Sequence, residues 1–343
     1  MHVGFVGLGR MGKHMVLRLK AHGFRVAAYN RSPEKVKEIE KSGVPGAYSL
    51  SELCQKLEAP RIVWLMVPHG QTVDDMIEKI APHLSKGDIV VDGGNSHYKD
   101  AVRRSKALAE KGISFLDIGT SGGLGGERHG YCFMAGGDAK AYAKVEPVLK
   151  VLAAPGGYAH FGPSGAGHFV KMVHNGIEYA LLQSYGEGFE LLKNSLDFKI
   201  DLHRASAVWN RGSVIRSWLL ELAEDALSKD GQLEKIGDQV GGGSTGEWTG
   251  LAGIEQKTPS PMISTALNAR YRTRQKESFA GKTVAALRNE FGGHEVVQKT
   301  SENEALPSVD LQKKARKKAE EKVRKKLRKT WPETYLKRAL KFL

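Results

Sequence analysis

Short apolar runs alternate with amphipathic stretches over the first half of the chain. Six runs have the length and composition of buried strands: HVGFVG, RVAAYN, RIVWLMV, DIVVDGG, SFLDIGT and, near residues 130–137, GYCFMAGG. Amphipathic stretches such as KHMVLRLKAHG and the segment after Ser32-Pro33 separate them, as helices separate the strands of a parallel sheet. The pattern therefore predicts an α/β domain with a doubly wound sheet over residues 1–163.

The pattern becomes helical from Ser164 onward. A helical periodicity without proline inside it continues to about Asn194, and Ser164 is its expected N-cap. Residues 200–293 are also mostly helical in pattern, but the glycine-rich segment DQVGGGSTGEWTG at 238–250 is expected to be a loop. Residues 300–307 have the composition of a linker. We therefore expect an all-α domain over residues 164–299 and a separate extension over residues 300–343.

The first apolar run ends in a glycine motif. The sequence GLGRMG follows an expected strand and opens an expected helix, with the GxGxxG spacing of a dinucleotide-binding turn. Glycines allow the tight turn, the close approach of a pyrophosphate to the backbone, and the packing of the helix on the strand. The motif predicts a Rossmann-type domain with cofactor contacts from every residue of the turn: Gly7, Leu8, Gly9, Arg10, Met11 and Gly12.

The end of the second expected strand indicates which nicotinamide cofactor is bound. NAD enzymes usually carry Asp or Glu here to accept a hydrogen bond from the ribose 2′-hydroxyl, whereas this chain has Asn30, Arg31 and Ser32. A guanidinium and two small polar groups suit a 2′-phosphate, so we expect NADP, with NAD as the alternative. Ser32 followed by Pro33 is also an ordinary helix start, and both interpretations can hold together.

The stretch KMVHNGIEY at 171–179 gathers reactive side chains. If it is helical, at about 100° per residue, one face carries all five of its polar or ionisable groups: Lys171, His174, Asn175, Glu178 and Tyr179. The opposite face then carries the apolar ones: Phe169, Val170, Val173, Ile177, Ala180 and Leu181. The solvent-exposed side of any amphipathic helix would show this spacing, so the spacing by itself assigns no chemistry.

Composition limits the class of protein. The chain of 343 residues is 41% apolar and 26% charged, which is ordinary for two globular domains. No apolar run approaches the roughly 20 residues that span a bilayer, and the N-terminus lacks a signal-peptide pattern, so we expect a cytoplasmic protein without a membrane partner. Cys54 and Cys132 are too few for a disulfide framework or a zinc site. We expect two free thiols and no metal.

The net charge of +14 is concentrated near the C-terminus. Residues 300–343 hold 14 Lys and Arg against six acids, which leaves +6 for the rest of the chain. Leu311, Ala315, Ala319, Val323 and Leu327 follow one another at intervals of four, as a thin apolar stripe on a basic helix. We interpret this segment as a solvated or weakly packed appendage, with contact to nucleic acid or an acidic surface as the alternative.

Three further stretches narrow the interpretation: GGNS at 93–96, TSGG at 120–123 and RNEFGGH at 288–294. Together with the glycine turn and the combination KxxHNxxEY, they resemble the decarboxylating 6-phosphogluconate dehydrogenase family in its short bacterial form, within the β-hydroxyacid dehydrogenase superfamily. The resemblance spans residues 1 to about 297. It implies oxidation of 6-phospho-D-gluconate by hydride transfer to the cofactor, loss of CO2 and formation of D-ribulose 5-phosphate, a reaction of the pentose phosphate pathway.

The resemblance also implies roles for individual residues. Lys171 matches the family's general base and Glu178 its general acid. Substrate contacts are implied for Asn95, Ser121, Gly122, Gly123, His174 and Asn175, and a phosphate site for Tyr179, Arg270, Arg288 and His294. Val67 and Asn95 are further candidate cofactor contacts. The family places the RxxxxxH segment in the partner subunit's active site, which implies a homo-oligomer, a dimer or a tetramer, formed by residues 164–299 as a substrate-binding and dimerisation domain.

Two departures and two rivals remain open. Gly243 takes the place of a lysine that long-form members carry in the glycine-rich loop, where Ser244 and Thr245 are candidates for part of its contact, and SGGLGGERHG differs from the family after Gly123. A β-hydroxyacid dehydrogenase for 3-hydroxyisobutyrate or tartronate semialdehyde is the nearest rival, although neither substrate carries a phosphate. The more distant rival is a non-catalytic protein that binds a dinucleotide or nucleic acid.

Overall fold

The computed structural model describes residues 2–242, 244–297, 317–318 and 321. Gly243, the expected linker and nearly all of the basic extension therefore lie outside the described residues. The chain folds as two compact units: Met1–Ala180 with Gly242–Leu267, and Leu181–Gly241 with Asn268–Leu343. The first unit contains a sheet covered by helices and the second is helical, which confirms the predicted fold class.

The sheet of the first unit has eight strands in the order β3-β2-β1-β4-β5-β6-β7-β8. Their bounds are β1 (His2–Val6), β2 (Arg25–Tyr29), β3 (Gly46–Ala47), β4 (Ile62–Leu65), β5 (Ile89–Asp92), β6 (Ser114–Ser121), β7 (Tyr131–Gly137) and β8 (Ala153–His160). All neighbours are parallel except β6 and β7. The order reverses between β1 and β4, and crevices at such reversals are where open α/β sheets bind ligands.

The six predicted strands are confirmed, and the structure adds β3 and β8. β3 has only two residues, too few to show a periodicity. β8 contains Pro155 and two glycines, which argue against a strand in the sequence alone. It is an edge strand with an irregular register against β7, and an edge is where a strand tolerates proline.

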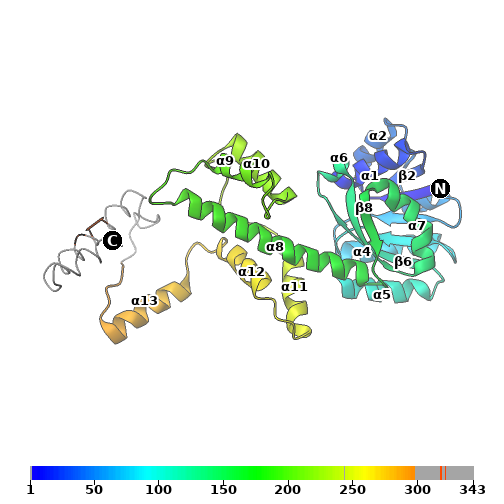
Figure 1. Cartoon of the computed structure of the whole chain (residues 1–343). Coiled ribbons are helices and arrows are strands. Elements are labelled where there is room, and N and C mark those ends of the chain that lie inside the picture. The colour runs from blue at the N-terminus through cyan, green and yellow to red at the C-terminus, as the bar shows by residue number, and fades with distance from the viewer. Residues whose placement is uncertain (1, 243, 298–316, 319–320, 322–343) are drawn as a thin grey trace. The chain divides into compact units, whose positions relative to one another are not determined.

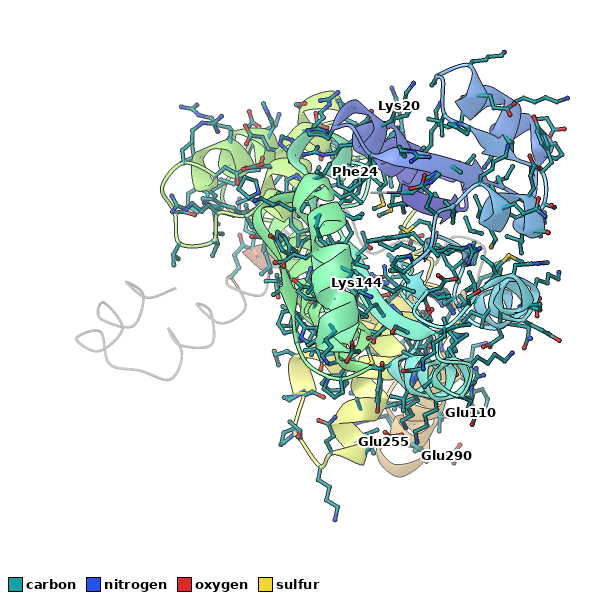
Figure 2. All side chains as sticks on the ribbon, turned by 90° about the vertical axis from the view of Figure 1, so that its right-hand side faces the viewer. Lys20, Phe24, Glu110, Lys144, Glu255 and Glu290 are labelled. Atoms are coloured by element: carbon teal, nitrogen blue, oxygen red, sulfur yellow. The ribbon has the colours of Figure 1, made fainter. Side chains whose placement is uncertain are left out.

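Two hydrophobic cores lie on opposite faces of this sheet. One joins apolar side chains of α1 (Arg10–Ala21) and α7 (Ala139–Leu152), and the other those of α3 (Leu50–Gln55), α4 (Gln71–Ile80) and α5 (Tyr98–Ala109). Strand side chains alternate between them: Val63 belongs to the second core and Trp64 to the first. Figure 2 shows Lys20 near the end of α1 and Lys144 on the exposed side of α7. Short helices complete this unit and its connections: α2 (Pro33–Glu40), η1 (Ala81–His83) and α6 (Gly126–His129).

The second unit is built from helices. It contains the C-terminal part of α8 (Ala166–Lys193), then α9 (Leu202–Trp209), α10 (Trp218–Lys229), the end of α12 (Pro261–Arg272) and α13 (Phe279–Gly292). α9 and α10 lie side by side (Figure 1), and side-chain oxygens cap both: Asp201 accepts from the Arg204 amide and Ser217 from the Leu220 amide. No helix in the described part of the chain is both long and apolar enough to cross a membrane.

Residues 238–250 are not entirely a loop, so that prediction is wrong in part. α11 (Ser244–Glu255) occupies their second half. Among the glycines that argued for a loop, Gly246 instead allows close packing within the first unit, because a Cβ there would overlap the Tyr179 ring. Gly176 on α8 contributes to the same packing, since a Cβ there would lie 2.6 Å from the Thr249 Cγ2. Thr249 Oγ1 also donates to the Met172 carbonyl at 2.7 Å. Tertiary contacts with α8 therefore outweigh the low helix propensity of glycine.

The expected N-cap of the long helix is also wrong. α8 begins at Ala166, and the Ser164 hydroxyl donates to the Ser105 hydroxyl at 2.8 Å. Amides at the start of the helix bind instead to the carboxylate of Asp117 on β6. Because the capping residue lies 48 positions before the Gly165 amide, the local sequence around Ser164 could not indicate it.

Candidate active site

The glycine turn between β1 and α1 has the geometry of a pyrophosphate cradle. Gly7 has φ +104°, and a Cβ there would overlap the Met66 carbonyl; a Cβ on Gly12 would overlap the Gly7 carbonyl. Around Gly9, by contrast, a Cβ would meet nothing within 4 Å, so its backbone borders open space at the start of α1. The turn can therefore hold an anion against the N-terminus of α1, as a dinucleotide requires.

Asn30 supports this turn from the end of β2. Its Oδ1 accepts from the Leu8 amide at 2.9 Å, so the side chain holds the glycine turn in place. Arg31 and Ser32 beside it are exposed, and α2 begins at Pro33 with Ser32 as its N-cap residue but without a cap from the Ser32 hydroxyl. The helix start and an exposed cation thus coexist here, as the sequence allowed.

Val67 and Asn95 follow neighbouring strands. Val67 comes after β4 and lies next to Gly7, across the reversal of strand order. Asn95 comes after β5 and binds the end of β6 twice: its Oδ1 accepts from the Thr120 amide at 3.2 Å and its Nδ2 donates to the Thr120 carbonyl at 3.3 Å. These bonds hold the loop after β5 against the strand that ends in Ser121.

Side chains from α8 and β6 meet in a chain of polar contacts. Lys171 Nζ lies 3.1 Å from His174 Nδ1, and His174 Nε2 lies 3.2 Å from the Ser121 hydroxyl. Asn175 Oδ1 lies 3.0 Å from the same His174 Nδ1. Glu178 Oε2 lies 3.9 Å from it. The structure therefore brings together four polar residues of KMVHNGIEY and the start of the Ser121-Gly122-Gly123 turn.

The polar side of this helix is buried at its centre, unlike the wet face of an ordinary amphipathic helix. Lys171 is 4% exposed and Tyr179 is 9% exposed, whereas apolar Ile177 is 51% exposed. Buried lysines are rare unless they are paired or functional. Because polar residues are buried and an apolar one is exposed, the polar spacing of α8 does not simply reflect contact with water.

Burial changes the protonation of the central residues. It lowers the pKa of Lys171 from 10.5 to about 8, although Glu178 and Cys132 favour the charged amine. Burial also lowers the pKa of His174, followed by repulsion from Lys171. An amine with this pKa can both accept and return a proton near neutral pH, which is what a general base that later acts as an acid requires.

The turn after Ser121 leaves room for a ligand. Gly122 has φ +116°, a conformation that side chains rarely adopt, and a Cβ on Gly123 would meet nothing within 4 Å. The backbone at Gly123 is therefore open to a small polar molecule near Ser121.

The remaining predicted residues belong mainly to the second unit. Arg270 lies in α12, and Arg288 lies in α13. α13 ends at Gly292 and is followed by Gly293, which has φ +59°, and the next amide, that of His294, donates to the Arg288 carbonyl at 3.4 Å. This turn explains the RxxxxxH spacing as a helix end. The grouping of these residues with Tyr179 as a phosphate site stays a prediction.

Two residues beside the site were missed from the sequence. Asp117 caps α8, and Trp248 on α11 packs edge-on against the rings of His69 and His97, with ring centres 5.1 and 4.9 Å apart. An acid inside the apolar run SFLDIGT was a usable signal for Asp117. Trp248 stands in the segment expected to be a loop, and no local pattern connected it to either histidine.

Comparison with known proteins gives consistent matches. Residues 2–165 match the model of the NAD binding domain of 6-phosphogluconate dehydrogenase, and residues 167–329 match that of its C-terminal domain. A Bacillus subtilis protein, YqeC, provisionally named a 6-phosphogluconate dehydrogenase, is 45% identical over 87% of this chain and 100% of its own. An NAD(+)-dependent, decarboxylating 6-phosphogluconate dehydrogenase of Haloferax volcanii is 44% identical over 87% of this chain and 99% of its own.

A solved structure is similar as well. Plasmodium falciparum 6-phosphogluconate dehydrogenase, described with NADP+ and with 6-phosphogluconate, superposes with a TM-score of 0.75 at 32% identity. The match covers 88% of this chain and 67% of that one.

Proposed function

Because the chain belongs to the 6-phosphogluconate dehydrogenase family, we propose that it converts 6-phospho-D-gluconate to D-ribulose 5-phosphate and CO2 with hydride transfer to NADP. The observation that carries the assignment to this site is the buried amine of Lys171 beside His174, on the helix face that also bears Glu178. A base and an acid on one side of one helix match a reaction that first removes and later adds a proton.

In this proposal Lys171 acts as the general base. Its pKa of about 8 leaves part of the amine neutral near pH 7, so the amine can accept the proton of the substrate 3-hydroxyl. The resulting ammonium then donates a hydrogen bond to the new carbonyl oxygen, which draws electrons from the bond to the carboxylate as CO2 leaves. Glu178 is the proposed acid that protonates the enediol carbon.

His174 couples the protonation of Lys171 to Ser121. When Lys171 is an ammonium, it donates to His174 Nδ1, and the neutral ring donates from Nε2 to the Ser121 hydroxyl. When Lys171 is neutral, Nδ1 can carry the proton and donate to Asn175 Oδ1, and Nε2 accepts from Ser121. The hydroxyl of Ser121 therefore reverses its role as the base changes charge, which matches a group that contacts the substrate in both steps.

The residues of the first unit fit a nicotinamide dinucleotide. The open backbone at Gly9 and the start of α1 would hold the pyrophosphate, and Arg31 would hold a 2′-phosphate. When bound, the cofactor supplies the hydride acceptor. One relative is NAD(+)-dependent and another is described with NADP+, and both support a nicotinamide dinucleotide as the cofactor. The exposed Arg31 supports NADP over NAD.

We further propose a homo-oligomer, a dimer or a tetramer, in which the segment 288–294 completes the partner's phosphate site. Two guanidiniums, Arg270 and Arg288, together with His294 suit a phosphate dianion. A cytoplasmic location stays a prediction.

Cofactor reduction with 6-phosphogluconate, measured separately with NADP and NAD while CO2 release is followed, tests this function. We expect one CO2 for each cofactor reduced. Turnover of 3-hydroxyisobutyrate or tartronate semialdehyde in preference to 6-phosphogluconate would support the nearest rival. No turnover of any of these substrates, in protein that binds NADP, would support a non-catalytic protein.

A further inference from the structure

Strand β6 faces α8 with every second residue. Asp117, Gly119 and Ser121 lie on one side of the strand, and each meets a successive turn of the helix. Asp117 binds the amides of Gly165 and His168, Gly119 lies under Lys171, and Ser121 contacts His174. The helix that carries the proposed base is thus matched to the strand residue by residue.

Asp117 holds the first turn of α8. Its side chain is fully buried, and its two oxygens accept from the Gly165 amide at 2.7 Å and the His168 amide at 2.9 Å. One carboxylate that binds both amides fixes the helix start in two directions. The contact is buried inside the sheet domain, away from solvent.

Glycines on both elements allow this close contact, because they have no Cβ. A Cβ on Gly167 would overlap the carbonyls of Asp117 and Met134, and one on Gly136 of β7 would lie 2.6 Å from the Gly167 amide. A Cβ on Gly119 would overlap the Lys171 side chain at its base. The backbone of α8 therefore lies directly on β6 and β7, and the stem of Lys171 lies directly on Gly119.

From these contacts we propose that Asp117 is a positioning residue for Lys171: it sets where α8 begins on β6, and so where the amine stands relative to Ser121. The inference rests on the proposed function, because it assumes that Lys171 is the base. Asp117 acts on Lys171 through the backbone of α8, because the His168 amide that it binds lies one turn before Lys171. It is not proposed to touch the substrate.

A cap could also serve stability alone, and α7 provides a control for the chemical change at an exposed helix cap. Asp138 caps that helix by accepting from the Ala141 amide at 2.9 Å, in the same unit, but α7 carries no residue of the site. Asp117→Asn keeps one oxygen acceptor and places an amide group against the second backbone N–H, which disturbs the position of α8 with little change in volume. Asp138→Asn makes the same chemical change where only stability should respond.

We expect Asp117→Asn to lower kcat roughly 10- to 100-fold, because displacements near 1 Å of a catalytic group have effects of this size. The KM for NADP should change less than about twofold, since the glycine turn is untouched. Asp138→Asn should leave kcat within about twofold. Native kcat in Asp117→Asn, or an equal loss in Asp138→Asn, would overturn the proposal.

A second variant keeps the test decisive where Asp117→Asn does not fold. Gly119→Ala adds one methyl group under Lys171 and should also lower kcat more than it raises the KM for NADP; a native kcat there overturns the proposal. Wild-type turnover of 6-phosphogluconate and its loss in Lys171→Met test the proposed function separately. If those two results hold and both positioning variants are normal, only the present inference fails.

Discussion

At the scale of single residues, the central feature is the amine of Lys171, whose protonated form is disfavoured by burial in the folded protein. The side chain of Lys171 is only 4% exposed, and this burial lowers its pKa from 10.5 to about 8. The folded state therefore binds this proton less well than the unfolded chain does. The low pKa that suits Lys171 to its proposed role as a base and a penalty in stability arise from the same desolvation.

Lys171→Met should separate these two effects. Turnover should fall about 100- to 10,000-fold with loss of the base, while NADP binding is retained. At pH 7, below both pKa values, the native protein bears the full penalty, which the pKa difference converts to about 3 kcal/mol at most. Urea unfolding at pH 7 should show the variant to be at least as stable as the native protein. Lys144→Met, at an exposed lysine of α7, should leave both turnover and unfolding near native.

The penalty that Lys171 imposes on the free energy of unfolding depends on pH. Because the unfolded chain holds more protons between about pH 8 and about pH 10.5, the contribution of Lys171 to the free energy of unfolding should rise across that window and be constant below it. The variant should lack this rise. Equal slopes for variant and native protein would mean that Lys171 keeps an ordinary pKa.

Catalysis should follow the same titration. The base must be neutral, so kcat/KM for 6-phosphogluconate should rise with pH through a limb near pH 8 and then level off. His174, Glu178 and Cys132 face the amine and contribute to the position of the limb. Rates measured from about pH 6 to about pH 10 test this. A limb that stays in place in Lys171→Arg would have to belong to another group.

At the scale of elements, we expect the connection from β2 to α2 to set the preference between NADP and NAD. Arg31 is exposed where the adenosine ribose of a bound dinucleotide is expected, while Asn30 is already used to hold the glycine turn. Cofactor preference should therefore depend on Arg31 and Ser32 and not on Asn30.

Arg31→Asp should shift the preference from NADP toward NAD. The change removes a charge-assisted contact to the 2′-phosphate, worth about 1.5 to 3 kcal/mol or roughly 10- to 100-fold, and adds an acceptor for a free 2′-hydroxyl. The ratio of kcat/KM for NADP to that for NAD measures the shift. Lys35→Asp makes the same change of charge on the exposed side of α2 and should alter the ratio much less. Equal shifts in the two variants would indicate a long-range electrostatic effect of the changed charge and no specific contact between Arg31 and the 2′-phosphate.

At the scale of the whole molecule, we expect the proposed site to be completed by residues of a second chain. Lys171 belongs to the first compact unit and Arg288 with His294 to the second. A symmetric oligomer that exchanges the segment 288–294 would provide both sets to every site.

Mixing two defective variants tests this exchange. Lys171→Met lacks the base, and the double variant Arg288→Ala with His294→Ala should have a strongly raised KM for 6-phosphogluconate. If the segment completes the partner's site, refolding the two together should restore about a quarter of native activity, because half of random dimers are hybrids with one complete site. Each variant refolded alone is the control. Activity that equals the average of the two separate variants would place the segment in its own chain's site.

The amino-acid order by itself determined the elements whose signals are local. Periodicity indicated six strands, the glycine spacing indicated the turn at Gly7, and the motif KMVHNGIEY placed Lys171 and Glu178 on one side of a helix. The resemblance to a family came from the same short motifs, and the comparisons confirm it. Each of these signals depends on residues within about one element of each other.

Only the tertiary structure decided what surrounds those elements. The burial of Lys171, the cap from Asp117 to α8, and the helix that includes Gly246 all depend on contacts between segments far apart in sequence. A periodicity shows that a helix has two faces, but not which face another segment will cover. The pKa of Lys171 follows from that covering, and so the chemistry of the site was decided by packing and not by spacing.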